Sequence, residues 1–107
     1  DTGNTLKLGS GCAVTNLKMT QTTAFVAGSQ VLIGITGGAA TSANNPLFQN
    51  VVGTTSVAGN TTILFQFNAG TSNAVIIDSE SHGITTALTD SGFNTGRIRL
   101  RKDGVIQ

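Results

Sequence analysis

The chain has 107 residues and a mass of 10.9 kDa, which suits one domain with one core and excludes a multidomain enzyme. Thr (17), Asn (9), Ser (8) and Gln (5) supply 39 residues and Gly another 14, while only 10% of residues are charged and 38% are hydrophobic. This composition is too apolar for a disordered chain and too poor in strong helix formers for a helical bundle, so it indicates an all-β domain.

Charge and cysteine content narrow the function classes further. A net charge of +1 gives no global field for nucleic acid, and none of the five Phe is interleaved with basic residues as a base-stacking surface requires. The longest apolar run, around residues 31–33, is far shorter than a bilayer span, so we expect no membrane insertion. Cys12 is the only cysteine, which excludes an intramolecular disulfide and a Cys-based zinc site. No motif calls for a cofactor.

Alternation of apolar and polar residues is the main pattern, and it predicts half-buried strands. In chain order the predicted strands cover residues 5–8, 13–22, 30–36, 47–52, 61–67, 73–79, 84–89 and 97–101, followed by a hairpin turn at 102–104. Gly, Asn, Ser and Thr fill the intervals, and Gly and Asn tolerate positive φ, which predicts turns there.

Seven or eight short strands in about 100 residues are typical of an antiparallel β-sandwich or jelly-roll-like domain, here covering 1–107. A segment of right-handed parallel β-helix is the alternative. The spacing follows no fixed period between about 20 and 50 residues, which favours the sandwich. The uncharged segment 61–67 is predicted to be a central strand with Ile63, Phe65 and Phe67 on one buried face, since an edge position would invite aggregation.

Several predicted strands also carry apolar residues at the positions between the alternating apolar ones, here called the second parity. These residues are Leu32, Leu64 and Ile76. A one-sided sheet would leave these side chains in water unless another layer or subunit covered them. Because so small a domain has no disulfide to supplement its core, we expect a homo-oligomer.

Asp78, Glu80 and His82 stand at i, i+2 and i+4, so a continuous strand would project them from one face. This cluster is a candidate metal site. Its two carboxylates could also act as acid and base on a glycoside, although no opposing face for a sugar is evident. The alternative interpretation is a solvated strand end that leads into a turn at Gly83.

Arg97, Arg99 and Arg101 likewise share one parity, and with Lys102 they hold four of the six basic residues. An anionic glycan or phosphate could bind there through bidentate guanidinium contacts. The alternatives are an edge strand kept soluble by charge and a row that pairs with acids of a neighbouring subunit. The chain lacks Trp and Tyr, which counts against a sugar-stacking site within one chain.

The stretch 3–19, GNTLKLGSGCAVTNLKM, resembles a rung of the right-handed β-helices of bacteriophage tailspikes. The remaining chain is similar in composition to the β-domains that follow such β-helices in tailspikes and tail fibres. The resemblance implies a viral protein, a homotrimer on the virion tail or otherwise extracellular, and attachment to a host cell-surface polysaccharide. No catalytic residue of the family can be carried onto a position here.

The first hypothesis is therefore a structural and attachment module without enzymatic activity, forming the C-terminal part of a longer chain because Asp1 follows no Met or leader. A self-contained carbohydrate-binding or capsid-decoration module is the second hypothesis. A fragment of a glycan-cleaving enzyme, with Asp78 and Glu80 as its acids, is the third.

Overall fold

The structure, a computed structural model, describes residues 4–8, 11–22, 29–35, 45–56, 61–92 and 94–107. These residues are all-β, and none of them forms a helix that could cross a bilayer. Sheet A consists of β1 (Asn4–Leu8), β3 (Ser29–Ile35), β5 (Thr61–Phe67) and β8 (Thr86–Asp90). Sheet B consists of β2 (Ala13–Gln21), β4 (Leu47–Thr55), β6 (Val75–Ile77), β7 (Glu80–His82), β9 (Gly96–Ile98), β10 (Arg101–Lys102) and β11 (Val105–Ile106).

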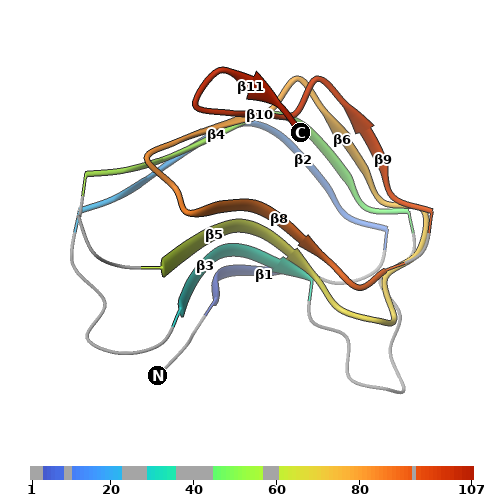
Figure 1. Ribbon diagram of the computed structural model, residues 1–107. Coiled ribbons are helices and arrows are strands. Elements are labelled where there is room, and N and C mark those ends of the chain that lie inside the picture. The colour runs from blue at the N-terminus through green and yellow to red at the C-terminus, as the bar shows by residue number, and fades with distance from the viewer. Residues whose placement is uncertain (1–3, 9–10, 23–28, 36–44, 57–60, 93) are drawn as a thin grey trace.

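The chain passes from sheet A to sheet B and back, and sheet B arches over sheet A (Figure 1). We call one passage through both sheets a coil: β1 and β2 form coil 1, β3 and β4 coil 2, β5 to β7 coil 3, and β8 to β10 coil 4. Neighbouring coils pair in parallel within both sheets. The described strands form one antiparallel pair, in which β11 folds back on β10 through a turn at Asp103 and Gly104, whose φ angles are 48° and 84°.

Most of the predicted strand positions are confirmed to within a few residues, and the hairpin turn at 102–104 is confirmed. The predicted strands 73–79 and 97–101 are each interrupted, and β7 was not predicted. The predicted antiparallel pairing is wrong for the strands from β1 to β10. Ala13, Leu47, Val75 and Gly96 share one register at spacings of 34, 28 and 21 residues, and these unequal intervals conceal the repeat from a search for a fixed period.

Aromatic packing between the two sheets forms the centre of the core. The ring of Phe48 in β4 lies 5.0 Å from that of Phe65 and 5.6 Å from that of Phe67, both in β5. β5 lies between β3 and β8, so the prediction of a central strand with Phe65 and Phe67 buried is confirmed. Ile63 is only half-buried, so that part of the prediction is not confirmed, whereas Leu64, of the opposite parity, is fully buried and lies against Gly53 of β4.

The second-parity residues Leu32, Leu64 and Ile76 are all buried within the single chain. Sheet B covers sheet A, so the second layer that these side chains require is present without a partner subunit. They therefore give no reason to expect self-association, and an oligomer interface has to be sought among other apolar residues.

Candidate functional site

Two positions in every coil of sheet B have a left-handed backbone. The first set consists of Gly11, Asn45, Asn73 and Asn94, with φ of 68°, 55°, 56° and 57°. The second set, five residues later in each coil, consists of Asn16, Asn50, Asp78 and Arg99, with φ of 56°, 54°, 48° and 58°. The parallel register of the flanking strands stacks the members of each set across the coils. We call the second set the outer ladder, because all four side chains are exposed.

Three of the four residues in the outer ladder are of types that a left-handed backbone tolerates. Asn and Asp adopt positive φ at little cost, because their short polar side chains can hydrogen-bond locally. The left-handed residue also interrupts the alternation, so that two successive side chains of the coil face outward instead of one. Phe48 and Val51 both face the core although they are three residues apart, with Gln49 and Asn50 exposed between them. The ladder therefore sets which side chains of each coil enter the core.

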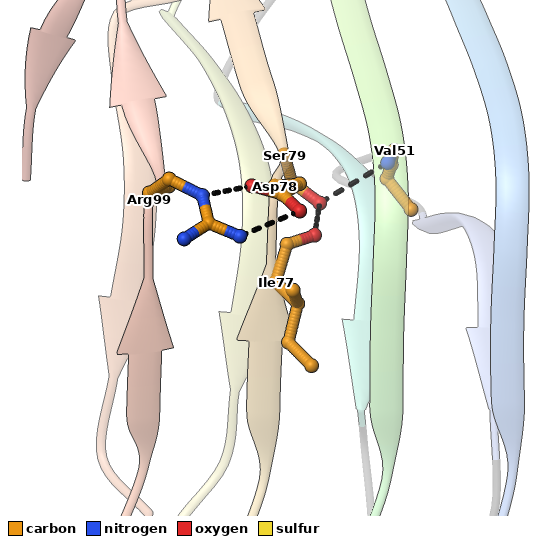
Figure 2. A network of polar contacts seen from close by, with 5 residues as sticks. All are labelled: Val51, Ile77, Asp78, Ser79 and Arg99. Carbon is orange, nitrogen blue, oxygen red and sulfur yellow. Dashed lines mark hydrogen bonds and ion pairs between the residues drawn. The ribbon is translucent and has the colours of Figure 1, made fainter.

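Side-chain bonds connect the ladder in pairs. The Asn50 Nδ2 donates to Asn16 Oδ1 at 2.8 Å, between coils 2 and 1. In coils 3 and 4 the Arg99 guanidinium donates from Nε to Asp78 Oδ1 and from Nη2 to Asp78 Oδ2, the latter at 2.9 Å (Figure 2). Asp78 thus supplies the carboxylate that holds a long cationic side chain at a backbone position where Arg is uncommon.

The hydrogen bonds to Arg99 lower the pKa of the Asp78 carboxyl, and the positive charges of Arg99 and Arg101 lower it further. Reciprocally, Asp78 raises the pKa of the Arg99 guanidinium. Ser79, the next residue, is fully buried. Its hydroxyl accepts from the Val51 N–H and donates to the Ile77 carbonyl, both at 3.1 Å (Figure 2). The hydroxyl satisfies backbone groups beside the point where the left-handed residue interrupts the regular strand.

The predicted cluster of Asp78, Glu80 and His82 is divided in the structure. Glu80 Oε2 lies 3.5 Å from His82 Nε2, whereas Asp78 is engaged by Arg99. Within the part of the chain that the structure describes, no three His, Cys, Asp or Glu side chains lie together as a metal site requires. Two of the three predicted ligands therefore pair with each other, and the third is held by Arg99.

The predicted row of Arg97, Arg99 and Arg101 is also divided, because positive φ at Arg99 breaks the alternation. Leu100 is fully buried, Arg97 stands in register with buried Ile76, and Arg101 stands in register with Glu80. The prediction that the three arginines share one face is wrong. Among the described residues Arg97 and Arg101 form no ion pair, so they are the arginines free to contact a ligand.

The outer ladder was not predicted from the sequence, although a signal was present. Gly or Asn followed five residues later by Asn, Asp or Arg recurs at 11 and 16, 45 and 50, 73 and 78, and 94 and 99. Both positions of this pattern favour residues that tolerate positive φ, with Arg99 as the exception.

Comparison with known proteins finds no matching family model, no matching curated protein and no matching solved structure.

Proposed function

We propose that this chain is a structural and attachment module of a bacteriophage tailspike or tail fibre, built as a segment of right-handed parallel β-helix. The in-register stacking of four coils, with two left-handed positions repeated in each, is the observation that supports the proposal. Such stacking builds a rod that lengthens by one coil at a time. Parallel crossovers are right-handed in about 98% of cases, which supports that hand.

The attachment role rests on Arg97, which forms no ion pair among the described residues. Arg97 is exposed and lies in coil 4. A guanidinium group binds carboxylate, sulfate or phosphate in bidentate geometry, which suits an anionic polysaccharide of a host surface. Asp78 neutralises Arg99, so Arg99 contributes to the ladder and not to this contact.

Binding to polysaccharide columns tests the attachment role. We expect the chain to be retained on heparin, an anionic probe, and to pass through a neutral dextran column. Retention should fall with added salt, because exposed charges are screened over about 8–10 Å at physiological ionic strength. Arg97→Ala should weaken retention more than Lys18→Ala, a matched loss of one exposed cation in coil 1. Equal retention of the two variants, or equal retention on both columns, would contradict the attachment role.

The assembly part of the proposal is a homotrimer located on the virion tail. Sedimentation equilibrium on the 107-residue chain at micromolar concentration measures it directly. A mass about three times 10.9 kDa is the expected result. A mass of one chain with cooperative unfolding would contradict the trimer.

A further inference from the structure

The outer face of sheet B carries apolar side chains that take no part in the core. Leu47 in β4 pairs with Val75 in β6, and Ile77 in β6 pairs with Ile98 in β9. Leu47, Val75 and Ile77 each stand next to a buried residue, and Ile98 stands next to Arg97, which is in register with buried Ile76. Because successive side chains of a strand point to opposite faces, the four side chains point away from sheet A. They form two apolar pairs across neighbouring coils.

Two of the most exposed large apolar side chains among the described residues extend this surface toward the chain end. Ile98 is 46% exposed and Ile106 is 58% exposed. Ile106 pairs with Arg101, and paired residues of adjacent strands share a face. Arg101 follows buried Leu100, which places both Arg101 and Ile106 on the outer side of the sheet. Val52 in β4 pairs with Glu80, which pairs with Arg101, so Val52 lies on the same side. The surface, here called the outer apolar surface, consists of Leu47, Val52, Val75, Ile77, Ile98 and Ile106.

We infer that the outer apolar surface binds a second copy of this chain, an inference that rests on the proposed homo-oligomer and locates its interface. The core is complete without these side chains, so cover from another molecule is the remaining way to remove them from water. Within the described residues, coil 4 contributes Ile98 and the hairpin contributes Ile106, which makes this end of sheet B the centre of the contact.

Charge on the same surface favours a copy of the chain as the occupant. Arg101 and Glu80 stand side by side in register, and among the described residues Arg101 forms no ion pair. A surface with a cation and an acid side by side can bind further copies of itself, because the Arg101 of one copy can meet the Glu80 of the next around the threefold axis of the proposed trimer. The net charge of +1 adds little repulsion between copies.

Glutamate substitutions on the hairpin provide a matched pair of variants. Ile106→Glu places a charge on the outer apolar surface. Val105→Glu places the same charge one residue away, at a side chain that is 64% exposed and pairs with Lys102 on the opposite side of the strand. Both positions are exposed, so both variants should fold, which circular dichroism verifies. Sedimentation equilibrium should show that the dissociation constant of self-association is at least about tenfold higher for Ile106→Glu than for wild type, a loss of the size seen at residues central to an interface. The dissociation constant of Val105→Glu should stay near that of wild type.

A charge swap gives a second readout. Arg101→Glu should weaken association, and adding Glu80→Arg in the same chain should restore it, because the two signs are then exchanged across the interface. If the wild-type chain associates and Ile106→Glu associates equally well, the inference is wrong and the proposed homo-oligomer stands with another interface. If the wild-type chain sediments as a single 10.9 kDa chain, the inference and the proposed homo-oligomer are both wrong.

Discussion

Asp78 and Arg99 occupy the same left-handed position in coils 3 and 4, and the Arg99 guanidinium donates two hydrogen bonds to the Asp78 carboxylate. The pair continues, with charged side chains, the stack that Asn16 and Asn50 form with amides in coils 1 and 2. Its members are 21 residues apart in sequence, so the pair connects coil 4 to coil 3.

The Asp78 carboxylate should make stability depend on pH in the acid range. Its pKa in the folded chain lies below the ordinary value of 3.8, so folding favours the charged form. The stabilisation is complete above the unfolded-state pKa and is lost as pH falls through the folded-state pKa. The melting temperature of wild type should exceed that of Asp78→Asn by a constant margin from neutral pH down to about pH 5, and the margin should shrink below about pH 4. A margin that stays constant down to about pH 2 would show that the carboxylate charge has no role.

Asn50 should be sensitive to substitution although its side chain is exposed. Asn50→Gly keeps the left-handed backbone accessible and loses the bond to Asn16, which costs at most about 1 kcal/mol at an exposed site. Asn50→Ala loses the bond and adds about 1–2 kcal/mol of left-handed strain. In urea unfolding, wild type and Gln49→Ala, which changes an exposed neighbour on the same strand, should have the highest free energies of unfolding. Asn50→Gly should be less stable than both, and Asn50→Ala should be the least stable. Equal stability of Asn50→Ala and Gln49→Ala would contradict the role of the ladder.

Phe65 should be among the most costly positions to truncate. Its ring is fully buried and lies within 6.1 Å, centroid to centroid, of both Phe48 and Phe67. A buried Phe→Ala substitution typically costs about 3–5 kcal/mol, a large share of the stability of a small domain. Phe65→Ala should therefore unfold or aggregate, while Val105→Ala, at an exposed site, melts like wild type. A soluble Phe65→Ala with an unchanged melting temperature would overturn the description of the core.

Gly53 and Gly96 should respond differently to the same substitution. A Cβ on Gly53 would lie 2.5 Å from Leu64 Cδ1 and 3.0 Å from Ile84 Cδ1, and both side chains are held in the core. Gly53→Ala should cost about 1–3 kcal/mol through overpacking. A Cβ on Gly96 would meet nothing closer than 3.8 Å, so Gly96→Ala should change the unfolding free energy by no more than about 0.5 kcal/mol. Indistinguishable urea midpoints for the two variants would contradict the close approach of the sheets at Gly53.

Most strands could be predicted because alternation is a local property of the chain. Leu17 and Met19 in β2 and Val31 and Ile33 in β3 occur at period two, and the structure places both segments in strands. The segments 73–79 and 97–101 were predicted as continuous strands and are each interrupted at a left-handed residue, Asp78 and Arg99. The alternation pattern cannot reveal such an interruption, because it assumes that successive side chains always point to opposite faces of the sheet.

The sequence by itself determined the all-β class, most of the strand positions and the burial of Phe65 and Phe67, because each follows from local pattern and hydrophobicity. Only the tertiary structure decided which strands pair and in which direction, because connections of unequal length bring Ala13, Leu47, Val75 and Gly96 into one register. That register also decided the candidate site. It stacks Asp78 on Arg99, separates Asp78 from the Glu80 and His82 pair, and leaves Arg97 and Arg101 without an ion pair among the described residues.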